Sequence, residues 1–117
     1  MNRKVLILED EVIVAMDIAA ELSDAGWTVI GPAGTVEKAE SISTAEKPDA
    51  AVLDINVNGV KSFDLATRLR EQGVGVIFLT GYSANSIPAD LGDCPIISKP
   101  VNFRSVIAAL EAIVSAE

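Results

Sequence analysis

The 117-residue sequence contains no histidine and only one cysteine, Cys94. A single cysteine cannot form an internal disulfide, and without histidine a zinc site of mixed Cys and His ligands is excluded. We expect Cys94 to be a small packing residue. Aromatic residues make up only 4% of the chain, although 50% of it is hydrophobic. The core must therefore be built from Val, Ile, Leu and Ala, which suits buried parallel strands covered by helices.

Positive charge and long apolar runs are also scarce. The formal net charge is −8, so phosphate backbones and anionic membranes would be repelled, and a basic partner or a divalent cation fits better. No apolar run approaches the roughly 20 residues that a membrane-spanning helix needs. Residues 1–4 lead directly into a short apolar strand, not into the core of a signal peptide. We therefore expect a cytoplasmic protein that binds neither nucleic acid nor membrane.

Apolar runs of strand length alternate with segments of helical period, which is the pattern of an α/β protein with a parallel sheet. At this length we expect one domain spanning residues 1–117. The predicted strands cover residues 4–9, 28–31, 50–55, 76–80 and 96–98. The predicted helices cover residues 11–25, a stretch between Thr35 and Pro48, residues 62–72, and the segment after Asn102. Residues 81–95 leave room only for a short or irregular fourth helix.

The last predicted helix carries the clearest amphipathic pattern, and the first also has an apolar face. In the first, Val12, Met16, Ala19 and Leu22 share one face, as in a helix that packs against a core. In the last, apolar residues recur with helical period from Phe103 onwards.

Polar side chains follow the ends of several predicted strands. Glu9 and Asp10 follow the first strand, Asp54 ends the third, Thr80 ends the fourth and Lys99 follows the fifth. In a parallel sheet these ends lie at the same edge, because right-handed crossovers bring every strand back in one direction. In doubly wound sheets the ligand crevice lies at that edge. We therefore expect these five side chains to form one site.

Converging carboxylates repel one another, by about 4 kcal/mol for a pair at 4 Å and an effective dielectric constant of 20. Oxygen ligands without His or Cys select Mg²⁺, so we predict Mg²⁺ held by Asp10, Asp54 and a main-chain carbonyl just after Asp54. The ion and the Lys99 ammonium would cancel the repulsion between Asp54 and an anionic phosphoryl group, and Thr80 would add a hydroxyl donor. The predicted chemistry is acyl-phosphate formation on Asp54.

These residues resemble the receiver domains of bacterial two-component response regulators. The matching features are the run from Val5 to Glu11, Val52-Leu53-Asp54 with Gly59 five residues on, Thr80 at the end of a strand, and Lys99-Pro100. Each is weak alone, but their order and spacing are highly specific, and the resemblance covers the whole chain. It implies a flavodoxin-like, doubly wound, five-stranded parallel sheet in the order 2-1-3-4-5, and a cis Lys99-Pro100 bond.

The resemblance also implies a role for each site residue. These roles are phosphoacceptor for Asp54, direct Mg²⁺ ligand for Asp10, outer ligand through water for Glu9, carbonyl donor for Asn56, phosphoryl partner for Lys99 and switch hydroxyl for Thr80. The chain would take a phosphoryl group from a histidine kinase or a histidine phosphotransfer protein and would switch a surface that binds a downstream protein. Its own chemistry would be limited to self-phosphorylation and slow self-dephosphorylation. The protein would be a monomer or a weak dimer.

The sequence departs from the common receiver pattern around the switch. Ile96 stands where many receivers have an aromatic residue, and an aromatic instead follows the threonine in Thr80-Gly81-Tyr82. This is similar to a Thr-Gly-Tyr subfamily of receivers with a reduced fourth helix. We predict that switching orders residues 81–92 with Tyr82 as the moving aromatic. A surface aromatic that packs against its own loop is an equally good interpretation of Tyr82.

Three other functions remain as alternatives. A pseudo-receiver would act as a protein-interaction module without phosphorylation, although every key position is filled. A flavin-binding module would need a hydroxyl- and glycine-rich phosphate loop after the first strand, where this chain has Glu9-Asp10-Glu11. A hydrolase of small phosphates would need a substrate-sized insertion, which the sequence lacks.

Overall fold

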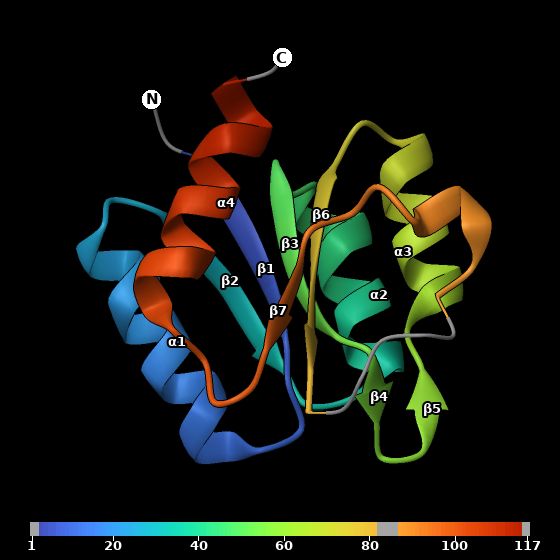
Figure 1. Cartoon of the computed structure of the whole chain (residues 1–117), viewed down its shortest axis with the longest axis horizontal. Helices are drawn as coiled ribbons and strands as arrows, with labels where there is room; N and C mark the ends of the chain where they lie inside the picture. The colour runs from blue at the N-terminus through green and yellow to red at the C-terminus, as the bar shows by residue number, and fades with distance from the viewer. Residues whose placement is uncertain (1–2, 82–86, 116–117) are drawn as a thin grey trace.

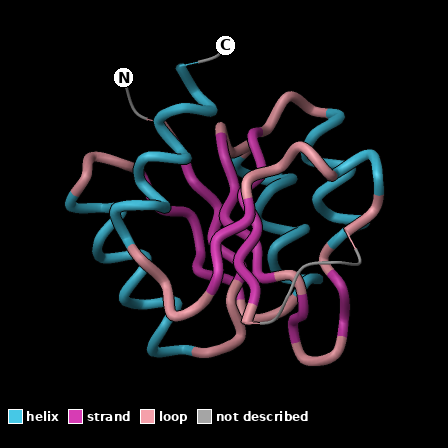
Figure 2. Tube along the Cα trace, in the orientation of Figure 1, coloured by secondary structure: helices cyan, strands magenta, loops and turns pink. Residues whose placement is uncertain are grey.

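A computed structural model describes residues 3–81 and 87–115 of the chain. The strands are β1 (Lys4–Leu8), β2 (Thr28–Ala33), β3 (Ala50–Asp54), β4 (Asn56–Val57), β5 (Val60–Lys61), β6 (Gly75–Thr80) and β7 (Ile96–Ser98). The helices are α1 (Val12–Asp24), α2 (Val36–Glu46), α3 (Phe63–Glu71), the short 3₁₀ turn η1 (Ala89–Leu91) and α4 (Phe103–Ser115). Figures 1 and 2 show a central twisted sheet with helices on both faces.

The central sheet has five parallel strands in the order β2-β1-β3-β6-β7. This is the predicted order 2-1-3-4-5, because β4 and β5 form a separate two-stranded hairpin outside the sheet. The strand order reverses direction between β1 and β3, the kind of position where doubly wound sheets bind ligands. The prediction of a flavodoxin-like fold is confirmed.

Successive side chains of the inner strands point to opposite faces, so each strand contributes to two cores. Leu6, Leu53 and Phe78 are fully buried in the core beneath α2 and α3. Ile7 and Val52 belong to the other core, beneath α1 and α4. Figure 1 shows these two helix pairs on opposite sides of the sheet. Burial on both faces explains why the strands are almost continuously apolar.

The helices α1 and α3 end in the same way, on a glycine. Gly26 and Gly73 have positive φ angles of 99° and 85°, a conformation that glycine adopts without a Cβ penalty. After α1, the N–H of Gly26 donates to Ser23 and the N–H of Trp27 donates to Leu22. These two hydrogen bonds satisfy carbonyl groups of the last turn, and they direct the chain toward the next strand.

The predicted buried face of α1 is wrong in its first half. The structure buries Ala15, Ile18 and Leu22, whereas Val12 and Met16 are 69% and 63% exposed. Residues 12–16 are all apolar, so their spacing does not say which side faces the sheet. The packing of Ile18 and Leu22 fixes the rotation of the helix, and the first turn is left with apolar side chains in solvent.

Two local predictions about strands also need correction. Strand β2 continues beyond the predicted end at Gly31, through Pro32 to Ala33. Proline is tolerated there because β2 is an edge strand and needs no second row of hydrogen bonds. The hairpin of β4 and β5, which turns at Asn58-Gly59, was not predicted. Both turn residues have positive φ, as the tightest hairpin turns require.

Other expectations concern the loops and the cysteine. The Lys99-Pro100 bond is cis, as predicted, and so is Gly31-Pro32. Between β6 and β7 the described residues contain only the 3₁₀ turn η1, in agreement with a short or irregular fourth helix. Cys94 is 6% exposed and packs in the core, and burial raises the pKa of its thiol. Among the described helices, none is long and apolar enough to cross a membrane.

Candidate functional site

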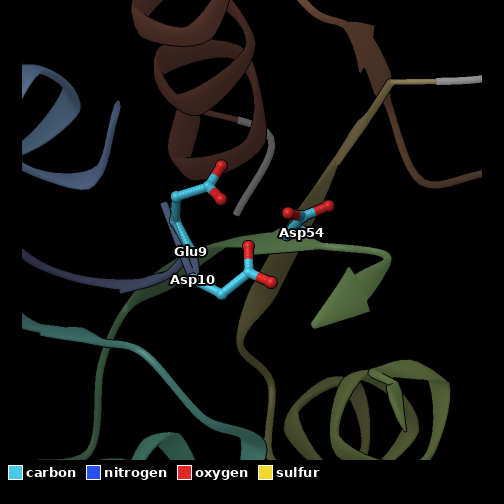
Figure 3. Close-up of side chains that lie close together, drawn as sticks. All are labelled: Glu9, Asp10 and Asp54. Atoms are coloured by element: carbon cyan, nitrogen blue, oxygen red, sulfur yellow. The ribbon is translucent and has the colours of Figure 1, made fainter. Parts of the chain in front are cut away.

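The carboxyl ends of β1 and β3 bring three acidic side chains together. Glu9 and Asp10 follow the last residue of β1, and Asp54 is the last residue of β3. One carboxylate oxygen from each of the three lies within 4.8 Å of the other two. Figure 3 shows the three carboxyl groups around a common space. Because β1 and β3 are adjacent parallel strands, the sheet itself creates this cluster.

Lys99 neutralises part of the cluster from the end of β7. Its Nζ lies 3.1 Å from Asp54 Oδ2, 2.7 Å from Glu9 Oε1 and 3.2 Å from Glu11 Oε1. Burial alone would lower the pKa of the Lys99 ammonium, but the contacts with Glu9 and Asp54 raise it above its ordinary value. Lys99 therefore remains charged, and it pairs with acids at the carboxyl ends of two adjacent strands, Glu9 after β1 and Asp54 at the end of β3.

Glu9 is the most deeply buried of the acids, with 2% of its surface exposed. Its Oε2 accepts a hydrogen bond of 3.0 Å from the Glu11 N–H. Its Oε1 lies at ion-pair distance from Lys99 but accepts no hydrogen bond of good geometry from any described residue. Burial raises the pKa of Glu9 to about 7, against the opposing influence of Lys99. The negative charge of an ionised Glu9 is thus only partly compensated by the groups around it.

Asp10 is held by the hairpin of β4 and β5. Its Oδ2 accepts a 3.0 Å hydrogen bond from the backbone N–H of Asn58, at the turn of the hairpin. Burial alone would raise the pKa of Asp10, but this hydrogen bond and several smaller contributions, among them the positive charge of Lys99, together outweigh it, and the pKa lies below its ordinary value. Asp10 is therefore ionised at neutral pH and fixed in orientation, which suits a metal ligand.

The donor set fits a divalent cation. Three carboxylates converge, the buried Glu9 Oε1 has an ion pair with Lys99 but no hydrogen bond of good geometry from the described part of the chain, and no nitrogen or sulfur ligand is among them. Hard oxygen donors of this kind hold Mg²⁺. Glu9, Asp10 and Asp54 are the residues that would hold the ion, with the Asn56 main-chain carbonyl as a further predicted ligand. Asn56 is exposed on β4, directly beyond Asp54 and Ile55.

The raised pKa of Glu9 predicts a pH dependence of the metal-free protein. The carboxyl group of Glu9 has a pKa of about 7 in the folded state, against an ordinary value of 4.5, so it binds its proton more tightly when folded. The folded state is therefore favoured at low pH, and stability is lost as pH rises from about 5 to about 8. The full loss is about 3 kcal/mol by the standard conversion of pKa units.

Urea unfolding in EDTA at pH 5, 6, 7 and 8 measures this loss. The Glu9→Gln variant removes the titrating group, so its free energy of unfolding should change less over the same range. A wild type whose stability rises from pH 5 to pH 8, or a variant with the same slope, would contradict the assignment of the raised pKa to Glu9.

The remaining predicted residues are placed as follows. Thr80 ends β6, is 8% exposed, and its carbonyl accepts a 2.8 Å hydrogen bond from the Lys99 N–H. The structure thus brings Thr80 and Lys99 to the same sheet edge as the acids. Tyr82 lies outside the described residues. The sequence assigned no role to Glu11, which pairs with Lys99; its position beside Glu9 and Asp10 was the available signal.

Together the fold and the site define a doubly wound α/β domain whose acidic pocket and lysine lie at the crossover of the sheet. The response regulator receiver domain family matches this chain over residues 5–111, and the chain belongs to that family. Receiver domains are the signal-receiving components of two-component systems and bind Mg²⁺ in such an acidic pocket.

Similar proteins agree with the family assignment. The chain is 29% identical to the transcriptional regulatory protein PdtaR of Mycobacterium tuberculosis, over 97% of this chain and 57% of PdtaR. It is 32% identical to the phyllosphere-induced regulator PhyR of Methylorubrum extorquens, over 94% of this chain and 43% of PhyR. The chain therefore spans about half the length of these relatives. The solution structure of SdrG from Sphingomonas melonis Fr1 superimposes with a TM-score of 0.82 and 32% identity, over 97% of each chain.

Proposed function

We propose that this chain is a phosphoacceptor receiver that carries a phosphoryl group on Asp54. The observation that supports this most directly is the 3.1 Å contact between Lys99 Nζ and Asp54 Oδ2 inside a pocket of three carboxylates. Asp54 is 5% exposed at the edge of the sheet, so its carboxylate is held in one place by the end of β3. A fixed carboxylate beside a cation is what in-line attack on a phosphoryl group needs.

The proposed reaction is a transfer between two protein side chains. A carboxylate oxygen of Asp54 forms a bond to phosphorus, and the bond between phosphorus and the imidazole nitrogen of the donor histidine breaks. The electron pair leaves with the imidazole, which takes a proton from solvent. Bound Mg²⁺ would neutralise charge on the phosphoryl oxygens. Lys99 would give up its ion pairs with Glu9 and Glu11 and bind a phosphoryl oxygen. The phosphoryl oxygen is anionic, as the two carboxylates are, and a phosphoryl group on Asp54 would lie within reach of the Lys99 ammonium.

The switch is proposed to begin at Thr80, whose hydroxyl would bond to a phosphoryl oxygen. A change there reaches the segment that follows β6 directly along the chain. We propose that residues 81–92, with Tyr82 as the moving aromatic, carry the response to a downstream protein, in the manner of a Thr-Gly-Tyr receiver. Exchange broadening and amide protection in this segment should change when a phosphoryl mimic is added.

Labelling with a small phosphodonor tests the proposed function. Incubation of the wild type with acetyl phosphate and Mg²⁺ should add one phosphoryl group to the intact mass, and hydroxylamine should remove it as it does from acyl phosphates. EDTA should suppress the gain. A protein that binds Mg²⁺ but never gains this mass would instead support the alternative of a phosphorylation-independent interaction module.

The donor is proposed to dock on the first turns of α1. Val12, Ile13 and Met16 are 69%, 76% and 63% exposed, and they form an apolar patch next to the acidic pocket. A groove of about 500 Å³ adjoins it, lined in part by Val14 and Phe103 and by the acids Glu11 and Asp17. Exposed apolar side chains beside acids suit a helix of the donor with apolar and basic residues.

We predict that Ile13→Asp slows phosphotransfer from a cognate phosphohistidine protein at least about tenfold, because a buried interface position would then hold an unpaired charge. Labelling by acetyl phosphate should keep its wild-type rate, since Ile13 lies outside the acidic pocket. Ile96→Asp, at a 41% exposed position on β7, is the matched control. Equal slowing of both donors, or of both variants, would argue against docking on α1.

A further inference from the structure

Ser62 is a fully buried hydroxyl residue just beyond the acidic pocket. It lies between the hairpin of β4 and β5 and the first turn of α3, and none of its surface is exposed. Its Oγ donates a 2.7 Å hydrogen bond to the carbonyl oxygen of Asp54, and the Ile55 carbonyl lies 3.4 Å away. Its backbone N–H also donates to Ile55 O at 3.0 Å. Ser62 thus contacts the main chain of the proposed phosphoacceptor across eight residues of sequence.

The direction of this hydroxyl is unusual for its position. Ser62 occupies the N-cap position of α3, where serine commonly accepts a hydrogen bond from the first turn of the helix. Its side chain makes no such bond. Thr35 shows the ordinary behaviour in the same chain, because its Oγ1 accepts a 3.1 Å hydrogen bond from the Lys38 N–H at the start of α2. The Ser62 hydroxyl instead donates its hydrogen bond to the Asp54 carbonyl and does not cap α3.

The Ser62 contacts close the loop that carries one predicted Mg²⁺ ligand, the Asn56 carbonyl. Residues 55–61 leave β3, form the hairpin and return to Ser62, so the two ends of the loop are tied together at Ser62. The turn of the hairpin is fixed by the hydrogen bond from the Asn58 N–H to Asp10. The backbone next to Asp54 is therefore held at two points, one of which also orients a carboxylate of the pocket.

We propose that Ser62 is a positioning residue for the phosphoacceptor. By fixing the carbonyl group of Asp54, it sets the direction of the carboxylate and of the main chain that would supply the Asn56 carbonyl. The Ser62 hydroxyl is directed at main-chain carbonyl oxygens, so it would act through the backbone of Asp54 and not as a ligand of the metal or the phosphoryl group. The proposal rests on the proposed function, and it adds a determinant of Mg²⁺ affinity outside the acidic residues.

Ser62→Ala tests the proposal, with Thr35→Ala as the matched control that removes a hydroxyl from a helix start far along the chain. Three quantities are measured for each variant: the ¹³C carbonyl chemical shift of Asp54 without metal, the Kd of Mg²⁺ from amide shift titration, and the acetyl phosphate labelling rate. Residues that orient metal ligands typically change metal affinity by 10-fold or more when removed.

For Ser62→Ala we expect a shifted Asp54 carbonyl signal, a Kd for Mg²⁺ raised about tenfold, and slow labelling that recovers toward the wild-type rate at saturating Mg²⁺. Thr35→Ala should lower the melting temperature and leave the Kd unchanged. A wild-type Kd in Ser62→Ala would overturn the proposal and reduce Ser62 to a structural role. Should Ser62→Ala not fold, Ser62→Cys keeps the volume with a weaker donor, and an unchanged Kd there overturns the proposal equally.

The two proposals fail in different ways. If the wild type binds Mg²⁺ but gains no phosphoryl mass, the proposed function fails, while the Kd comparison still decides the role of Ser62. If the wild type is labelled and Ser62→Ala has the wild-type Kd, only the positioning role fails. The carbonyl shift of Asp54 is independent of both, because it reports the hydrogen bond directly in the metal-free protein.

Discussion

Asp54→Asn is expected to abolish phosphoryl incorporation from acetyl phosphate. The asparagine amide has nearly the volume of the carboxylate, so the pocket should keep its shape, but a neutral amide is no nucleophile toward phosphorus. Glu9 does not replace Asp54, since it is buried and its pKa is raised to about 7. Asp10 does not replace it either, because the hydrogen bond from Asn58 holds one of its oxygens. Intact-mass spectrometry of wild type and variant, with and without Mg²⁺, measures the effect.

Asp64→Asn is the control for Asp54→Asn, because Asp64 is an exposed aspartate in the first turn of α3. That variant should be labelled like the wild type. Thermal melts add a second comparison: Mg²⁺ should raise the melting temperature of the wild type more than that of Asp54→Asn, which lacks one carboxylate ligand. Phosphoryl incorporation that persists in Asp54→Asn would place the acceptor on another residue.

Lys99→Met is expected to affect both stability and chemistry. Methionine keeps the apolar stem of the side chain but removes the ammonium group that lies within 3.2 Å of Glu9, Asp54 and Glu11. Loss of one partner from a buried charge cluster costs about 3 kcal/mol, because the remaining charges stay out of water uncompensated. We expect this loss of unfolding free energy in EDTA at pH 8, above the pKa of about 7 of Glu9.

Added Mg²⁺ should restore part of the stability lost in Lys99→Met, because a cation in the pocket replaces the missing positive charge. The labelling rate should stay roughly 100-fold below the wild-type rate even then, since the phosphoryl oxygens lose a charged donor. Lys61→Met, at an exposed lysine of β5, is the matched control and should change neither quantity. A Lys99→Met variant as stable as the wild type in EDTA would mean that the acids do not need this cation.

The strands and the acidic pocket were predictable because both follow from periodicities along the chain. Continuous apolar runs marked the buried strands, and the acids Asp10 and Asp54 stood where those runs ended. Parallel strands separated by helices place such ends at one edge, so adjacency could be inferred without coordinates. The 4.8 Å cluster and the contact of Lys99 with Asp54 agree with that inference.

The exposed face of α1 and the roles of Glu11 and Ser62 were not predictable in this way. The first turn of α1 is apolar on all sides, so only the packing of Ile18 and Leu22 decides which residues reach solvent. The hydroxyl of Ser62 has two possible partners of similar strength, the first turn of α3 that follows it and the carbonyl group at the end of β3. Which one it takes depends on where the hairpin returns the chain.

The sequence by itself determined the fold class and the side chains that gather at one edge of the sheet, because both depend on patterns within a short stretch and on the direction of parallel strands. The strand order was expected only from the resemblance to receiver domains. Only the tertiary structure decided how charge is distributed in the pocket. Burial of Glu9, the three ion pairs of Lys99 and the hydrogen bond from Ser62 to Asp54 join residues from 8 to 90 positions apart. Distances across such separations arise from packing of the whole chain, which no local pattern encodes.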